Sequence, residues 1–198
     1  MEPSTIIFIG PQGSGKGTQI EKIKTVISAL DPERKLVDVQ TGRLFRELIA
    51  DQDTYAEKKI KESLSAGVLQ PDFLTYVLWG QEMIKHLNPD SHLIIDGFPR
   101  TVAQAEVLVG ALTFFERPLI HVINIDTPEM VVRERMLSRA RTDDTQEAIE
   151  NRLRWYREDT LPVLDYYRNQ SNVLVHDIDG NNVIDVVHEE ILSALKLK

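Results

Sequence analysis

A glycine-rich segment that ends in a lysine is the feature that most constrains the fold of this chain. It reads Gly10-Pro11-Gln12-Gly13-Ser14-Gly15-Lys16 and matches the pattern G-x-x-x-x-G-K. An apolar run at residues 5–9 precedes it, and isoleucines recur at helical spacing over residues 17–30 behind it. A strand, a glycine-rich turn and a helix in this order predict a loop whose backbone N–H groups bind phosphate oxygens. Glycine permits the dihedral angles and the close approach this requires, and Lys16 would place a positive charge at the β- and γ-phosphates.

Short apolar runs alternate with segments of helical periodicity along the whole chain. Residues 5–9, 92–95 and 119–125 are nearly continuous in Ile, Leu and Val, which is typical of strands buried on both faces of a parallel sheet. Weaker strand candidates are residues 36–39 and 172–175. Helices are predicted over residues 17–30, 71–87, 101–112, 128–137, 145–167 and 182–197, and residues 51–69 read as polar and mostly helical. The alternation predicts an α/β fold of three layers, in which a five-stranded parallel sheet binds ligands at the carboxyl ends of its strands.

The composition narrows the class of protein further. With 198 residues, of which 42% are hydrophobic, the chain suits a single domain with small insertions. It has no cysteine, and its five scattered histidines lack zinc-site spacing, so we expect no structural zinc and assign no histidine a catalytic role. The apolar stretch near the start is too short for a signal peptide or membrane span, which predicts a cytoplasmic protein without a membrane partner. A net charge of -8 argues against a nucleic-acid partner.

The second half of the chain is rich in arginine. Seven arginines fall between positions 133 and 157, namely Arg133, Arg135, Arg139, Arg141, Arg152, Arg154 and Arg157. Such a cluster can be a solvated helix face, or it can bind an anion, because the planar guanidinium matches phosphate oxygens. Two tryptophans, Trp79 and Trp155, lie on helical patterns and are predicted to pack in the core rather than stack on a base.

Several motifs together resemble the adenylate kinase family. The phosphate loop continues into Gly15-Lys16-Gly17-Thr18-Gln19, similar to the family's G-K-G-T-Q, and residues 96–100 read D-G-F-P-R, also as in the family. Thr41-Gly42 with Arg46 resembles its T-G-D-x-x-R segment. Arg135 and Arg139, followed by Arg141-Thr142-Asp143-Asp144 and Arg152, resemble the arginines around its lid. The resemblance covers nearly the whole chain. It implies a nucleoside monophosphate kinase of the short-lid type that reversibly moves the terminal phosphoryl group of ATP to AMP, giving two ADP.

The resemblance also implies a role for individual residues. Catalytic roles fall to Lys16, Arg100, Arg139, Arg141 and Arg152. ATP would contact Gly13, Ser14, Gly15, Lys16, Gly17, Thr18, Arg135, Arg139 and Asn182. AMP would contact Thr41, Gly42, Arg46, Val68, Leu69, Gln70, Gly97, Phe98, Pro99, Arg100, Gln104, Arg141 and Arg152. Asp96 would hold Mg²⁺ through water. Asp143 and Asp144 could bind metal, but the sequence favours a helix cap or a pairing with a nearby arginine. One domain, residues 1–198, would carry an AMP-binding insert near 41–70 and a lid near 136–144, and would act as a monomer.

The sequence departs from the general phosphate-loop motif at one place and from the family pattern at three. Gly17 follows Lys16 where other phosphate loops have Ser or Thr, so Mg²⁺ would be held mainly by phosphates and water, with Thr18 nearby. Arg43 replaces the usual acidic residue after T-G, and Gln70 stands where a small apolar residue is common. The lid is very short, since only Ala140 separates Arg139 from Arg141. Incomplete exclusion of water would allow some ATP hydrolysis without an acceptor.

The acceptor base depends on few contacts. Gln104 offers a donor and an acceptor to the N1/N6 edge of adenine, whereas the related uridylate–cytidylate kinases typically have Asn at the matching position. This favours AMP. A kinase for UMP, CMP or another monophosphate stays open as an alternative, and so does a nucleotide-binding regulator with little turnover.

Overall fold

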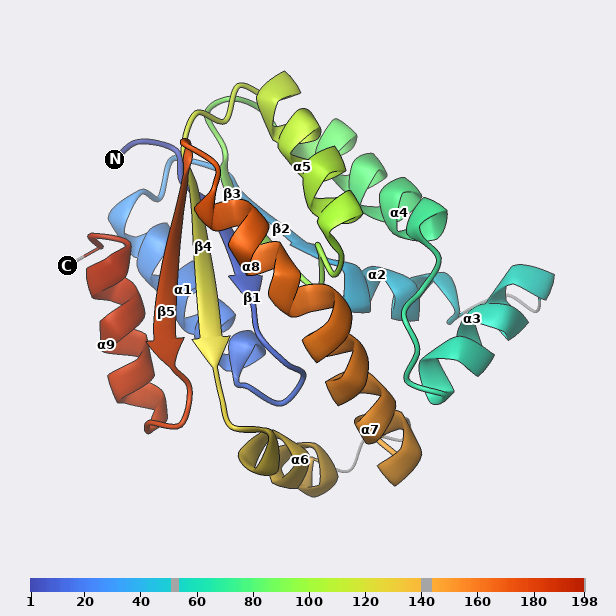
Figure 1. Cartoon of the computed structure of the whole chain (residues 1–198). Coiled ribbons are helices and arrows are strands. Elements are labelled where there is room, and N and C mark those ends of the chain that lie inside the picture. Colours follow the sequence, from blue (N-terminus) through green and yellow to red (C-terminus); the bar gives the residue numbers. More distant parts are fainter. Residues whose placement is uncertain (51–53, 140–143, 198) are drawn as a thin grey trace.

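The computed structural model describes residues 1–50, 54–139 and 144–197. Its centre is a sheet of five parallel strands in the spatial order β2-β3-β1-β4-β5 (Figure 1). The strands are β1 (Thr5–Ile9), β2 (Leu36–Gln40), β3 (His92–Asp96), β4 (Ile120–Asp126) and β5 (Val173–Asp179). The helices are α1 (Lys16–Leu30), α2 (Thr41–Leu48), α3 (Tyr55–Ser65), α4 (Asp72–His86), α5 (Val102–Phe114), α6 (Glu129–Ser138), α7 (Gln146–Trp155), the π-helix η1 (Tyr156–Thr160), α8 (Leu161–Arg168) and α9 (Ile184–Ala194). The predicted α/β fold is confirmed, and none of the described helices is long and apolar enough to cross a membrane.

Strand β1 explains why the sheet is covered on both faces. Successive side chains of a strand point to opposite faces, and here Ile6 and Phe8 pack with α1 and α9, while Ile7 and Ile9 pack with α4, α5 and α8. Every residue of β1 is buried. An uninterrupted apolar run is therefore what this position requires, and the prediction for residues 5–9 matches β1 at both ends.

Three elements differ from the sequence prediction. Strand β5 runs to Asp179, beyond the predicted residues 172–175, and it is an edge strand with several half-exposed or exposed side chains, so its apolar signal is weak. The segment 145–167, predicted as one helix, is interrupted by η1, which ends next to Pro162. Proline has no N–H to donate to the preceding turn and its ring crowds that turn, so a wider π-turn forms there. Helix α2 was not predicted as a separate helix.

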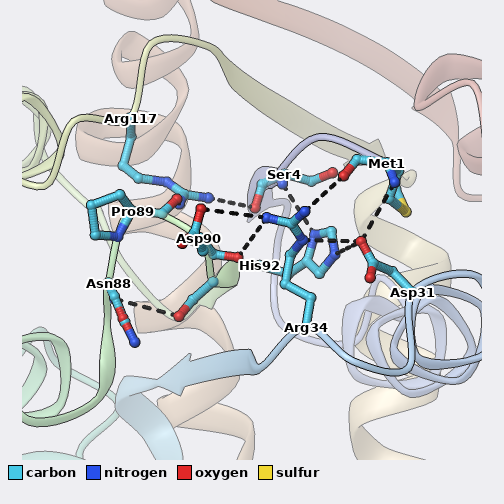
Figure 2. Close-up of polar contacts among 10 residues, drawn as sticks. Met1, Ser4, Asp31, Arg34, Asn88, Pro89, Asp90, His92 and Arg117 are labelled. Carbon is cyan, nitrogen blue, oxygen red and sulfur yellow. Dashed lines mark hydrogen bonds and ion pairs between the residues drawn. The ribbon is translucent and has the colours of Figure 1, made fainter.

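A cluster of polar contacts closes the edge of the sheet where the strands begin (Figure 2). His92 is fully buried, and its Nδ1 accepts a hydrogen bond from the backbone N–H of Ser4 at 3.1 Å, while its Nε2 lies 3.4 Å from the Asp31 carboxylate. Arg117 donates to the carbonyl oxygens of Ser4 and Pro89 at 3.0 and 2.8 Å. His92 therefore has defined polar partners. Two other histidines, His121 and His176, lie against each other, with ring nitrogens 3.1 Å apart.

Candidate active site

A cleft of about 1130 Å³ opens at the opposite edge, where the strands end. The phosphate loop forms its floor, α2 and residues 68–70 form one end, and residues 180–184 at the start of α9 form the other. Asp96 at the end of β3 and Gly180 after β5 both line it. The cleft thus lies where ligands bind in parallel α/β sheets, as the sequence predicted.

The glycines of the phosphate loop meet two physical requirements. Gly10, Gly13 and Gly15 have φ angles of 148°, 88° and 98°, which side chains of L-residues rarely adopt. Gly10 and Gly13 also lie against other backbone, because a β-carbon would sit 2.7 Å from the Ile125 carbonyl oxygen and 2.9 Å from that of Val132, respectively. The loop is therefore wedged between β4 and α6. Gly15 is the N-cap of α1, so the positive end of that helix faces the cleft.

Lys16 is folded back over the loop. Its Nζ donates to the carbonyl oxygens of Gly10 and Pro11, both at 2.8 Å. Burial lowers the pKa of Lys16 to about 8; the Asp96 carboxylate opposes this change, and the charges of Arg100 and Arg139 add to it. The amine of Lys16 therefore loses its proton only slightly above neutral pH. It interacts electrostatically with Asp96, Arg100 and Arg139, which the sequence also singled out.

Two oxygens at the floor of the cleft have no hydrogen-bond partner among the described residues. Asp96 ends β3 beside Phe8 of β1, and its Oδ1 is buried without a hydrogen bond from any described residue. The same holds for Oγ of Ser14, in the loop itself. A buried carboxylate oxygen without a protein donor is suited to waters held by Mg²⁺, so the residues present fit the metal role given to Asp96.

A shared carboxylate holds two of the proposed catalytic arginines together. Asp144 accepts from Nε and Nη2 of Arg139 at 2.5 and 3.0 Å, and from Nη1 of Arg152 at 2.5 Å. Burial opposes ionisation of Asp144, but the hydrogen bonds and charges of these arginines outweigh it and hold its pKa below the ordinary value. The predicted pairing of Asp144 with arginine is confirmed. Arg141, the fifth proposed catalytic residue, lies outside the described residues, as does Asp143.

Arg100 lies between a strand end and an aromatic ring. Its Nε donates to the Gly97 carbonyl oxygen at 2.7 Å, and its guanidinium carbon is 5.1 Å from the ring centre of Trp155. Burial lowers the pKa of Arg100, and the neighbouring Asp96 opposes this. Trp155 is buried, as predicted, but it also lines the cleft, and its indole N–H donates to the Gly67 carbonyl oxygen at 2.9 Å. Sequence reasoning missed this role. No local sequence pattern signals it, because the contact with Arg100 joins distant parts of the chain.

The side chain proposed to recognise the acceptor base is already hydrogen-bonded. Oε1 of Gln104 accepts from the backbone N–H of Arg100, and its Nε2 donates to Oδ1 of Asp72, both at 2.7 Å. Gln104 is only 2% exposed, which excludes an ordinary helix-surface position. An adenine base in this pocket would compete with the Arg100 N–H and with Asp72 for the Gln104 amide, which now links α5 to α4.

Arg43, which departs from the family pattern, and Arg135, which matches it, both have defined contacts. Arg43 donates to the Asp38 carbonyl oxygen at 3.0 Å and pairs with Glu47 at 3.2 Å, so it lies along the wall of the cleft. At the opposite end Arg135 donates to the Gly180 carbonyl oxygen at 3.2 Å, close to Asn182 in sequence. This contact joins α6 to the turn before α9.

Most of the proposed residues within the described ranges line this one cleft. They are Gly13, Ser14, Gly15, Lys16, Gly17, Thr18, Thr41, Gly42, Arg46, Val68, Leu69, Gln70, Asp96, Gly97, Arg100, Gln104, Arg135, Arg139 and Asn182. Phe98, Pro99 and Arg152 are not among the described residues that line it. Phe98 instead stacks on Trp79, with ring centres 5.2 Å apart, and Trp79 is a core residue as predicted.

Comparison with known proteins decides the family. The family model described as adenylate kinase matches residues 8–172. The chain belongs to the adenylate kinase family. One relative is an adenylate kinase of Cyanothece sp. It is 39% identical to this chain over 180 residues, which are 89% of this chain and 87% of that protein. An adenylate kinase of Corynebacterium urealyticum is 35% identical over 190 residues, 96% of this chain and 98% of that protein. An adenylate kinase 1 of Nostoc sp. is 35% identical over the same length, covering 96% and 97%.

Proposed function

We propose that this chain transfers the terminal phosphoryl group of ATP to AMP, reversibly, to give two ADP. The observation that carries this proposal is the single cleft that joins the phosphate loop to Arg100 and Arg139. A donor triphosphate on the loop and an acceptor phosphate on Arg100 would meet within it. Family membership supports the same reaction, because several relatives carry the name adenylate kinase.

The residues of the cleft act by position and charge. In the transition state of phosphoryl transfer, negative charge is spread over the equatorial oxygens of the transferring group. Fixed positive groups stabilise this charge, and no side-chain nucleophile is required. In our proposal the loop N–H groups and Lys16 bind the donor phosphates. Arg46 and Arg100 bind the acceptor phosphate, and Arg139, Arg141 and Arg152 surround the transferring group.

Mg²⁺ bound with ATP would supply charge neutralisation at the phosphate oxygens. Asp96 would orient the water around it, with Thr18 nearby, because Gly17 has no hydroxyl to offer. The side chains of this protein would align the two phosphates, and Asp144 would hold Arg139 beside the transferring group. The chain is further proposed to act as a monomer, which sedimentation at working concentrations would test.

An acceptor panel tests the proposed reaction. Each of AMP, UMP, CMP and GMP is offered with Mg·ATP, and nucleoside diphosphate formation is measured beside a sample with ATP alone. We expect AMP to be the best acceptor and slow ATP loss without any acceptor. If AMP ranks among the poorest acceptors, the base assignment fails and a kinase for another monophosphate replaces it. If ATP binds but no acceptor is phosphorylated, the protein is a nucleotide-binding regulator.

A further inference from the structure

The end of α3 is bound by side chains of α7. The last carbonyl groups of a helix have no donor within that helix, and here side chains of α7 donate to one of them and to the carbonyl groups of the two residues that follow α3. Nη2 of Arg152 donates to the Leu64 carbonyl oxygen at 3.3 Å, and Nδ2 of Asn151 donates to that of Ala66 at 2.9 Å. The indole N–H of Trp155 donates to that of Gly67 at 2.9 Å. The proposed AMP-binding insert is thus attached to α7 along one turn.

The contact between the two segments is backbone against backbone at its centre. Gly67 has a φ of 67°, and a β-carbon on it would lie 2.4 Å from the carbonyl oxygen and 2.8 Å from Cα of Ala148. Ala148 is fully buried in α7. Residues 68–70, which carry the proposed base contacts, follow Gly67 directly and line the cleft. The close packing of Gly67 on α7 therefore determines the position of residues 68–70.

Trp155 connects this contact of Gly67 to the acceptor-phosphate arginine. One edge of its indole binds Gly67, and its ring faces the guanidinium of Arg100 at 5.1 Å. The side chain is 8% exposed and forms part of the cleft wall. An aromatic face attracts a guanidinium more strongly where the two groups are shielded from water, and here Trp155 is buried and Arg100 is half-buried. A single side chain therefore contacts both parts of the proposed acceptor pocket, the phosphate end and the base end.

We propose that Trp155 is a positioning residue for the acceptor nucleotide. It holds the Arg100 guanidinium in one plane through its ring and holds residues 68–70 in place through its N–H bond to Gly67. The inference rests on the proposed function, in which Arg100 binds the acceptor phosphate. The two contacts of Trp155, with Gly67 and Arg100, both lie at the acceptor end of the cleft, so its effect falls on the acceptor and not on ATP.

Two substitutions separate the two contacts of Trp155. Trp155→Phe keeps an aromatic face for Arg100 and loses the N–H donor, whereas Trp155→Leu loses both. We expect the KM for AMP to rise about threefold in the first and about tenfold or more in the second, with kcat reduced in the second. The KM for ATP should stay within about twofold of the parent in both, since the ATP end of the cleft is unchanged. An equal rise in both KM values, or an unchanged KM for AMP, would overturn the inference.

A binding measurement keeps the test independent of turnover and of folding in the Leu variant. The chain has two tryptophans, so the variant Trp79→Phe leaves Trp155 as the only indole that fluoresces. The kinetic parameters of Trp79→Phe serve as the reference when it is combined with Trp155→Phe or Trp155→Leu. AMP alone, without ATP, should change the emission of Trp155 in a saturable way. No change would contradict the proposed position. If the wild-type protein itself transfers nothing to AMP, the proposed function has failed; if it does and the Trp155 variants keep its AMP parameters, only this inference has failed.

Discussion

Lys16 shows how one buried amine can make nucleotide binding depend on pH. Burial lowers its pKa to about 8; the Asp96 carboxylate opposes this change, and the charges of Arg100 and Arg139 add to it. The amine is charged below pH 8 and neutral above it, so the attraction for phosphate declines as the pH rises through that value. We predict that the dissociation constant for ATP, measured by calorimetry between pH 6.5 and 9.5, rises above pH 8.

The control for this prediction removes the titrating group. Lys16→Met should bind ATP more weakly at every pH, and its dissociation constant should no longer rise above pH 8. Proton uptake on binding above pH 8, detected by repeating the titration in buffers of different ionisation enthalpy, should accompany the wild-type trend. A wild-type profile as flat as that of the variant would contradict the assigned pKa.

Asp144 is the residue whose loss should affect two arginines at once. Its side chain is 1% exposed and holds both Arg139 and Arg152. Asp144→Asn removes one side of a buried charge pair, for which the usual cost is on the order of 3 kcal/mol in the free energy of unfolding. We also predict a fall in kcat of about 10²-fold, because the arginines at the transferring group are no longer fixed. Denaturant unfolding and steady-state rates check both. Unfolding energy and kcat that both stay near wild type would show that Asp144 holds neither arginine.

Motifs that resemble those of the adenylate kinase family predicted much of the candidate site. The glycines, Lys16 and the arginines occur in fixed patterns because phosphate recognition restricts which residues can serve, and most of them line one cleft. Two features could not be read from the chain. Trp155 gains its role from a contact with Arg100, 55 positions away in sequence (155 − 100), and Gln104 is bound by Asp72 on another helix. Both depend on tertiary packing that no local pattern encodes.

At the scale of elements, burial decided which predictions succeeded. Strand β1 is buried on both faces and was predicted at both ends, while the edge strand β5 was predicted only in part. Helix α2 follows directly on β2 and begins at Thr41, so no turn residues separated them in the sequence. The π-turn η1 lies inside a periodic pattern, and periodicity does not distinguish it from the helices on either side.

The docking of α3 on α7 gives the element-scale prediction. Gly67→Ala places a methyl group against the Ala148 backbone and in a φ region unfavourable to alanine, so the insert must move away from α7. We predict a loss of about 1–2 kcal/mol in unfolding free energy and a higher KM for AMP at unchanged KM for ATP. The matched control is Gly110→Ala in α5, where a β-carbon would meet nothing within 4 Å. That change should be neutral or stabilising by up to about 1 kcal/mol. Equal effects of the two substitutions would contradict the packing argument.

The candidate active site lies at one edge of the sheet, and a cluster of buried polar contacts, which we call the structural lock, lies at the other. The lock is centred on His92, whose Nδ1 must be unprotonated to accept from Ser4. Burial lowers the pKa of His92 below its ordinary value of 6.5; the Asp31 carboxylate opposes this, while Arg34 and Arg117 reinforce it. The unfolded chain therefore binds a proton more readily than the folded one. Stability from this site is fully present above about pH 6.5 and declines as the pH falls toward the folded-state pKa.

The variant His92→Asn tests this lock, because its side-chain oxygen can replace Nδ1 as the acceptor and cannot titrate in this range. We predict that the urea midpoint of the wild-type protein falls between pH 7.5 and pH 5, and that the fall is shallower in the variant. Some slope should stay, because burial also lowers the pKa values of His121, His176 and His188. The variant should be less stable than wild type at pH 7.5, since Asn cannot also reach Asp31 as the ring does. If the urea midpoints of the wild type and the variant fall in parallel as the pH is lowered, protonation of His92 does not destabilise this edge of the sheet.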